Sequence, residues 1–307
     1  MESLKALYQC RQIVAIGGGH GLGRVMASLG FMEEKLAGIV ATTDDGGSTG
    51  RLREASGCIA WGDLRNCLNQ LCSDSPNLAR ILFEYRFKNS GEFSGHNLGN
   101  LIMLAMDQMC VRPLDAVNLI RKMLQVGAQL IPMSEEPARL AAMLDGEKIV
   151  GETVIDALDK RPDQLMLLPD IKPTSEAVSV IEQADLIILG PGSFMTSILP
   201  SLLMNDIAEA INNNHDALKV FVGNINPETT VVGKQPIAEK LGWMQEMTGV
   251  YPDVLLWPEE YDRPEGVRCA IRQLSLSDPH QKGAHSREAM RNALDLLVQQ
   301  HLTNKVC

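Results

Sequence analysis

Short, continuous apolar runs alternate with longer amphipathic segments along the chain. Five of these runs have the length of a strand and lack an exposed polar face; they cover residues 12–16, 36–42, 185–189, 218–222 and 253–257. Such runs are typical of parallel strands that are covered by helices on both sides. The pattern therefore predicts an α/β protein with a Rossmann-like, doubly wound, mostly parallel sheet, in which 253–257 is the last central strand.

Two stretches depart from this alternation. Helical periodicity in consecutive segments predicts an inserted helical block at about 62–125, with helices over 62–72, 76–87, 97–109 and 113–124. The stretch at about 128–154 contains a hairpin-like pattern around Asp145-Gly146 and predicts a small β excursion. Later helices are expected over 174–183, 236–248 and 286–302. We expect all of these elements to form one domain over residues 1–307.

Composition narrows the class of protein. The chain has 307 residues, of which 45% are hydrophobic and 21% charged, as in ordinary globular proteins. A net charge of -10 argues against nucleic acid or an anionic membrane surface as the main partner. No apolar run reaches the roughly 18 residues that a membrane-spanning helix needs, so we expect no membrane insertion. The charged N-terminus does not resemble a signal peptide.

The cysteines indicate the compartment. There are seven, an odd number, and no CxxC pair occurs. We expect free thiols in a reducing cytoplasm, with a disulfide framework or a zinc site as the alternatives.

The first strand is followed directly by the glycine-rich sequence GGGHGLGR. Gly18, Gly19 and Gly21 would let backbone N–H groups approach a ligand closely. The helix that follows offers its positive N-terminus to a phosphate, and Arg24 can add a charge-assisted contact. The spacing fits neither the dinucleotide fingerprint nor a Walker A loop. We predict a phosphate-binding loop of another kind; a turn that needs glycine only for packing is the alternative.

An acidic loop, TTDDGGSTGR, follows the second strand. Asp44 could hold a ribose hydroxyl or a divalent cation that bridges phosphates. Asp63, in the sequence WGDLRN, is a candidate second carboxylate for the same metal. Gly46 and Ser48 are expected to contact the ligand, as is Asp45. The alternatives are that Asp45 starts a turn and that Asp63 caps a helix.

A third motif, SGHNLGN, opens an apolar helix of the helical block. Ser94 or Asn97 can cap this helix, and His96 and Asn97 could instead reach into a site. Gly99 inside the helix costs about 1 kcal/mol relative to alanine. This cost indicates the close approach of either a helix or a ligand.

A fourth motif, GPGSFMTS, follows the run 185–189 and repeats the logic of the first. Gly190 and Gly192 form the turn, and Ser193 and Thr196 bring hydroxyls to a helix N-terminus. Two such turns in one sheet predict a shared crevice where the strand order reverses. Asn224, after the next strand, is expected to close the pocket over a base or a sugar. The motif lacks the G-x-S-x-G pattern of a serine hydrolase.

Together with IPMSEEP, these motifs resemble the gluconeogenesis factor family, which is related to 2-phospho-L-lactate transferase in the CofD-like superfamily. The resemblance covers about residues 12–257 and rests on GGGHGLGR, TTDDGGSTGRLR, WGDLRNCL, SGHNLGN, IPMSEEP and GPGSFMTS in this order. It implies a Rossmann-like sheet with a helical insertion. It also implies a nucleotide ligand such as UDP-N-acetylglucosamine (UDP-GlcNAc), NAD(P) or GDP, and a role in cell shape and envelope synthesis during growth on gluconeogenic carbon sources.

The resemblance also implies site residues. In the transferase branch Mg²⁺ lies on carboxylates near the diphosphate, and the matching positions are Asp44 and Asp63, with Asp45 a weaker match. His20, Asn97 and Ser193 match positions that line the family's cleft. One departure occurs: where the family has a His-Asp pair before its last helix, this chain reads AHSR, so we assign no role to His285.

Two functions stay open. One is a nucleotide-sugar-binding regulator with little or no catalysis. The alternative is a Mg²⁺-dependent transferase that moves a phospho-organic acid from a nucleoside diphosphate to an acceptor alcohol, with Asp44 or Asp63 as the catalytic carboxylate. The aromatic content of 4% offers little to stack a flavin-like acceptor, which favours the regulator. A dehydrogenase would suit Asp44 but not the glycine spacing. We expect a homodimer.

Overall fold

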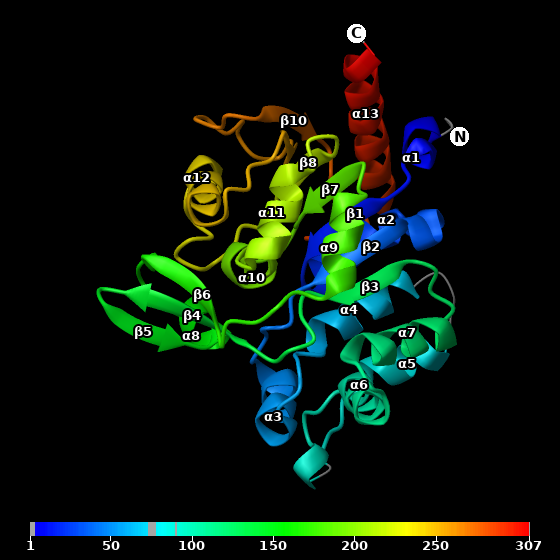
Figure 1. Ribbon diagram of the computed structural model, residues 1–307, viewed down its shortest axis with the longest axis vertical. Helices are drawn as coiled ribbons and strands as arrows, with labels where there is room; N and C mark the ends of the chain where they lie inside the picture. Colours follow the sequence, from blue (N-terminus) through cyan, green and yellow to red (C-terminus); the bar gives the residue numbers. More distant parts are fainter. Residues whose placement is uncertain (1–3, 73–77, 90, 307) are drawn as a thin grey trace.

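A computed structural model of the chain describes residues 4–72, 78–89 and 91–306 (Figure 1). Its main feature is a seven-stranded parallel sheet with the strand order β10-β9-β8-β7-β1-β2-β3. The strands are β1 (Ile13–Gly17), β2 (Leu36–Val40), β3 (Gln129–Pro132), β7 (Leu186–Leu189), β8 (Leu218–Val222), β9 (Val254–Pro258) and β10 (Ala270–Leu274). Helices pack on both faces, so the predicted doubly wound α/β fold is confirmed.

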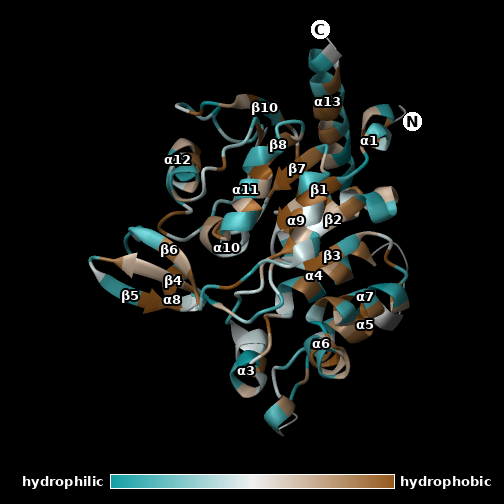
Figure 2. Ribbon diagram, viewed as in Figure 1, coloured by the Kyte–Doolittle hydropathy of each residue, from teal (hydrophilic) through white to brown (hydrophobic). Residues whose placement is uncertain are grey.

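The central strands are buried on both faces, as their apolar runs predict. In β1, Ile13 and Ala15 face one hydrophobic cluster, and Val14 and Ile16 face the other, because successive strand side chains point to opposite sides. β7 is coloured as hydrophobic in Figure 2, whereas α13 alternates between hydrophobic and hydrophilic turns.

The helices divide between these two clusters. The cluster of Ile13 receives side chains from α1 (Lys5–Gln9), α2 (Gly19–Ser28), α4 (Gly62–Leu71), α5 (Leu78–Glu84), α6 (Leu98–Met109), α7 (Pro113–Met123) and α13 (Arg287–Val306). The cluster of Val14 receives them from α9 (Ser175–Glu182), a π-helical turn η3 (Phe194–Ile198), α10 (Leu199–Leu202), α11 (Asn205–Asn213) and α12 (Ile237–Thr248). Short 3-10 segments occur at η1 (Gly30–Lys35) and η2 (Gly91–Phe93).

The helical block contains the four predicted helices, and a further helix that the pattern does not predict precedes it. Helices α4, α5, α6 and α7 agree with the four expected segments, although residues 76 and 77 lie outside the described part of the chain. The additional helix α3 (Gly47–Ser56) follows the acidic loop. Its sequence GSTGRLREAS is too polar and glycine-rich to show an apolar stripe, so periodicity could not reveal it.

The predicted β excursion is confirmed, with its hairpin at Asp145-Gly146, but its bounds differ from the expected 128–154. β3 pairs in parallel with β2 and belongs to the main sheet. A separate antiparallel sheet, in the order β5-β4-β6, is formed by β4 (Arg139–Leu144), β5 (Glu147–Val150) and β6 (Gln164–Leu168), with α8 (Glu152–Asp156) after β5. In Figure 1 this small sheet lies on the opposite side of the molecule from the helical block.

The prediction that 253–257 is the last central strand is confirmed by β9, and one further strand that the pattern does not predict, β10, pairs with β9 at the edge of the sheet. The sequence of β10, AIRQL, is half polar and its side chains are exposed or half-buried, so this edge strand leaves no apolar run.

The strand order places the site. From β1 the chain builds β2 and β3 on one side, and it then returns to build β7, β8, β9 and β10 on the other. In doubly wound sheets the crevice at such a reversal, at the carboxyl ends of the strands, is where ligands bind. In this chain the reversal lies between β1 and β7.

Two further observations concern the class of protein. No helix among the described residues is long and apolar enough to cross a membrane. The six cysteines within the described part of the chain are free thiols.

Candidate functional site

The two glycine turns meet at the strand-order reversal, because β1 pairs directly with β7. A Cβ added to Gly21 would lie 2.5 Å from the carbonyl oxygen of Pro191, and one added to Gly17 would lie 3.7 Å from the Cα of Gly190. Only glycine at position 21 allows this backbone approach. The convergence that the sequence predicts is therefore present in the fold.

The second turn is held by side chains from the segment after β8. Asn224 accepts a hydrogen bond from the amide of Gly192 (3.0 Å) and donates one to its carbonyl (2.9 Å). The carboxylate of Glu228 accepts a hydrogen bond from the amide of Phe194 (2.9 Å) at the start of η3. Two amides of the predicted phosphate turn thus have partners within the protein, and Asn224 positions the turn.

The first turn faces the carboxylate of Asp63, which lies in the first turn of α4. A Cβ on Gly18 would lie 2.2 Å from Asp63 Oδ2, and one on Gly19 would lie 3.2 Å from its Oδ1. The carboxylate is therefore close to the N-terminus of α2, where the helix dipole favours negative charge. Burial and the nearby charge of Asp44 raise the pKa of Asp63 to about 7.

Asp44 and Asp63 belong to a group of carboxylates at the carboxyl end of β2. Glu152 joins them: burial, followed by the charges of Asp44 and Asp63, raises the pKa of Glu152 well above its ordinary value. Arg53 supports the acidic loop by donating to the carbonyls of Thr43 (2.8 Å) and Asp44 (2.9 Å). Carboxylates that repel one another in this way suit a hard cation.

The two carboxylates Asp44 and Asp63 could hold Mg²⁺ together with a ligand, but not by themselves. Within residues 4–72, 78–89 and 91–306, no group of three His, Cys, Asp or Glu side chains is arranged to hold a metal ion by itself. Mg²⁺ usually takes one or two protein carboxylates and completes its octahedron with water and substrate phosphates. Asp44 and Asp63 fit that role.

Asp45 has a structural use that neither sequence reading, a ligand contact or the start of a turn, includes. Its carboxylate accepts hydrogen bonds from the amides of Glu152 (3.0 Å) and Thr153 (3.1 Å), which open α8. Asp45 thereby fastens the helix beside the small sheet to the acidic loop. The amide of Gly46 donates to Asp44 Oδ1 (2.9 Å) and fixes that side chain.

Ser48 and Asn97 lie in a buried polar network between α3 and α6. Ser48 Oγ is 3.1 Å from His96 Nδ1 and accepts a hydrogen bond from the amide of Asn97 (3.2 Å). Asn97 caps α6 by accepting from the amide of Asn100 (3.3 Å). A Cβ on Gly99 would lie 2.6 Å from a backbone carbonyl of the preceding segment, so a close helix contact explains that glycine.

Arg24 contacts the C-terminal segment, in contrast to the predicted phosphate contact. Its guanidinium donates to the carbonyl of His285 and pairs with Asp278. The ring of His285 is buried and donates from Nε2 to the carbonyl of Gly223 (2.9 Å), and burial lowers its pKa to about 4. Sequence reasoning gave His285 no role; the structure shows that it joins this segment to the end of β8.

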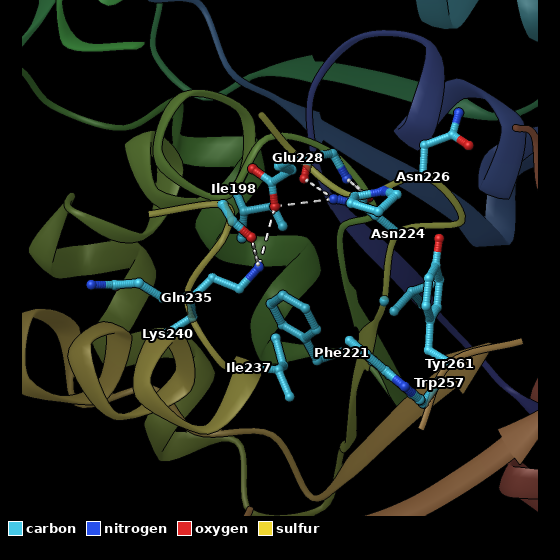
Figure 3. A pocket seen from close by; sticks show the side chains of 15 residues that line it. Ile198, Phe221, Asn224, Asn226, Glu228, Gln235, Ile237, Lys240, Trp257 and Tyr261 are labelled. Carbon is cyan, nitrogen blue, oxygen red and sulfur yellow. Dashed lines mark hydrogen bonds and ion pairs between the residues drawn. The ribbon is translucent and has the colours of Figure 1, made fainter. Parts of the chain in front are cut away.

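Two adjoining pockets open beside the glycine turns. One, of about 780 Å³, lies between the turns and the segment 281–285, and His20, Gly21 and Arg24 are among its lining residues. The other, of about 600 Å³, lies over the end of β8 and against α12 (Figure 3). Both are lined by Gly192 and Asn224, so they form one cleft across the carboxyl ends of β1, β7 and β8.

The predicted site residues thus fall into different places. The hydroxyl of Ser193 is buried without a hydrogen-bond partner, beside the cleft-lining Gly192, and Thr196 is buried in η3. Sequence reasoning missed Lys240, Trp257 and Tyr261, which line the second pocket. The sequence contained only a weak signal for this pocket, namely two aromatic residues, Trp257 and Tyr261, near the end of one strand in a chain with few aromatic residues.

Comparisons with known proteins agree with this geometry. The family model described as "2-phospho-L-lactate transferase CofD" matches residues 13–290. A Vibrio cholerae protein named "Putative gluconeogenesis factor" is 45% identical over 292 residues, which cover 94% of this chain and 98% of that protein. A Listeria innocua protein named "Gluconeogenesis factor" is 40% identical over 302 residues, with 92% of each chain covered.

Solved structures give the same result. The crystal structure of a UPF0052 family member from Bacillus halodurans superposes with a TM-score of 0.82 and 28% identity, covering 92% of this chain and 98% of that one. The glycine turns, the strand order and these similarities lead to one conclusion: the chain belongs to the 2-phospho-L-lactate transferase CofD family and, within it, groups with the proteins named gluconeogenesis factors.

Proposed function

We propose that this protein binds a nucleoside diphosphate compound, such as the nucleotide-sugar UDP-GlcNAc, and that it acts as a regulator of the gluconeogenesis factor type. The observation that carries the proposal is the meeting of two glycine turns at the reversal of strand order, directly beside a cleft. That is the place where doubly wound folds bind nucleotides.

The first glycine turn would hold the diphosphate. It opens α2, a ten-residue helix, and Gly19 and Gly21 lie in the turn whose amides lack partners within the helix. The positive helix end and these amides favour an anion. His20 is exposed at the edge of the cleft and could contact the same ligand.

Magnesium would resolve a conflict of charge at this position. A diphosphate beside Gly18 would come close to the carboxylate of Asp63, which already lies next to Asp44. A cation held by these two carboxylates would neutralise the diphosphate and bring it to the turn. Asp44 and Asp63 would then be metal ligands.

The names of the relatives favour the regulator over the transferase, because proteins 40% and 45% identical to this chain are called gluconeogenesis factors. The regulator would support cell shape and envelope synthesis during growth on gluconeogenic carbon sources. We expect deletion of the gene to impair growth and rod shape on such carbon sources but not on glucose. Normal growth and shape of the deletion strain on both would contradict this role.

Ligand binding is tested by thermal unfolding with UDP-GlcNAc, UDP, GDP, NAD and NADP, each with Mg²⁺ or EDTA. A bound ligand at a hundredfold excess over its Kd stabilises the native state by about 2.7 kcal/mol. We expect at least one nucleoside diphosphate compound to raise Tm in the presence of Mg²⁺, and the Asp44→Asn variant to lose the dependence on Mg²⁺. If no compound changes Tm, the proposal fails.

A further inference from the structure

The pocket of about 600 Å³ has an unusual lining for a protein so poor in aromatic residues. Phe221 on β8, Trp257 on β9 and Tyr261 just after β9 all contribute to it. Figure 3 shows Trp257 and Tyr261 on one side of the pocket and Ile237 and Lys240, from α12, on the other. Of the three tryptophans in the chain, Trp61 and Trp243 are buried and Trp257 is the one that lines this pocket.

The polar ends of these aromatic residues already have partners. The indole Nε1 of Trp257 donates to the carbonyl of Asp262 (3.1 Å), and the hydroxyl of Tyr261 donates to the carbonyl of Ile225 (2.5 Å). Their rings remain as pocket surface. A ligand in this pocket would therefore meet ring surface more than hydrogen-bonding groups.

The charges in the pocket wall also compensate each other. Lys240 Nζ lies 3.4 Å from Glu228 Oε1, and the side chains are 10% and 12% exposed. The same ammonium donates to the carbonyl of Gly233 (3.2 Å). Because Lys240 and Glu228 neutralise each other, the pair offers no net charge to an anionic ligand group. The pocket therefore suits a neutral ligand group.

The indole is held in place before any ligand arrives. A Cβ on Gly223 would lie 2.6 Å from Trp257 Cε3 and 3.0 Å from Cζ3, so the ring edge rests against the backbone of residue 223. Tyr261 packs beside it, with 6.2 Å between the ring centroids. A ring fixed in this way loses little conformational entropy on binding.

We infer that this pocket is the nucleobase subsite and that Trp257 is its stacking residue. The inference rests on the proposed function and deepens it. A planar, uncharged heterocycle needs ring surface and few hydrogen bonds, which is what this lining provides. The side chains of Asn224, Trp257 and Tyr261 already have partners, whereas two further lining residues, Asn226 and Gln235, supply the few amide groups that the edge of a base needs, and Gln235 Oε1 is buried without a partner. Gly192 lines both pockets, so a base here and a diphosphate at the turns can belong to one molecule.

The test compares ligands with and without a base in titration calorimetry with Mg²⁺. UDP, GDP, UDP-GlcNAc and inorganic pyrophosphate are titrated into the wild type, Trp257→Leu and Trp257→Phe. For the nucleoside diphosphate that binds the wild type, we expect Trp257→Leu to raise the Kd by roughly tenfold or more, because one base–aromatic stack is lost. The Kd of pyrophosphate should stay unchanged. Trp257→Phe keeps a ring and should restore most of the affinity. Tyr8→Leu, which removes a 58% exposed aromatic residue on α1, is the matched control.

Each other outcome has a distinct meaning. Unchanged nucleoside diphosphate affinity in Trp257→Leu overturns the inference and leaves the proposed function intact. A loss for UDP-GlcNAc without a loss for UDP assigns the pocket to the sugar and also overturns it. If the wild type binds neither UDP nor GDP, the proposed function fails together with the inference. Should Trp257→Leu not fold, Gly223→Ala displaces the ring by a different route and is expected to show the same selective loss, whereas equal affinity would refute the inference.

Discussion

Replacing Asp63 by asparagine should make the protein's stability less dependent on pH. Burial and the charge of Asp44 raise the pKa of Asp63 from 3.8 to about 7, so the folded state keeps this carboxyl protonated at pH values where the unfolded chain has released the proton. Stability must then fall as pH rises from about 4 to about 7, because ionising the folded protein costs free energy. Asparagine has the shape of the acid and cannot ionise.

The magnitude follows from the change in proton affinity. At about 1.4 kcal/mol for each tenfold change, a pKa of about 7 corresponds to a ceiling of about 4 kcal/mol between pH 4 and pH 8. That pKa already includes the hydrogen bond from Asn66 and the charge of Arg65, both of which lower the pKa of Asp63. We therefore expect Asp63→Asn to gain stability relative to the wild type on going from pH 4 to pH 8, by about 2–4 kcal/mol.

Urea unfolding at a series of pH values in EDTA measures this difference. The relevant quantity is the wild-type free energy of unfolding minus that of Asp63→Asn at each pH, since all other titrating groups are shared. Asp206→Asn is the control, because it removes an exposed carboxylate from the first turn of another helix, α11. Parallel pH profiles for the wild type and Asp63→Asn would refute the argument that Asp63 is the titrating group beside the glycine turn.

Two further predictions follow from packing and charge. Gly21→Ala places a Cβ 2.5 Å from the carbonyl oxygen of Pro191, so it should lower the free energy of unfolding by about 1–3 kcal/mol and weaken nucleotide binding. The control Gly242→Ala adds a Cβ in open space on α12 and should raise the free energy of unfolding by about 0.5–1 kcal/mol. Equal Tm values for the two variants would contradict the close approach of the turns. Lys240→Met removes the cation beside Glu228, whose buried carboxylate then keeps only neutral donors, and should cost about 3 kcal/mol in urea unfolding. Much of this loss should be recovered in the double variant with Glu228→Gln, and a single variant as stable as the wild type would mean that the pair is not desolvated.

The acidic loop shows how far motif reasoning reaches. Adjacent acids after a strand predict a group of carboxylates, and Asp44 does lie with Asp63 and Glu152. The adjacent residue Asp45 does not join this group, because its carboxylate caps α8, more than a hundred residues further along the chain. A cap formed by so distant a segment leaves no trace in the local sequence, because any acidic residue in a turn has the same appearance.

Sequence by itself determined the buried strands and the two glycine turns. A parallel strand covered on both faces must be apolar throughout, and a backbone approach such as that of Gly21 to Pro191 excludes a side chain. Both requirements restrict the type of residue at each position, so they can be recognised from the sequence. The tertiary structure decided the rest: that 129–132 joins the main sheet, that Arg24 contacts the C-terminal segment, and that Trp257 lines a pocket. Those outcomes depend on which distant segments pair, and the free energy of such a pairing belongs to both partners together, so neither stretch of sequence specifies it alone.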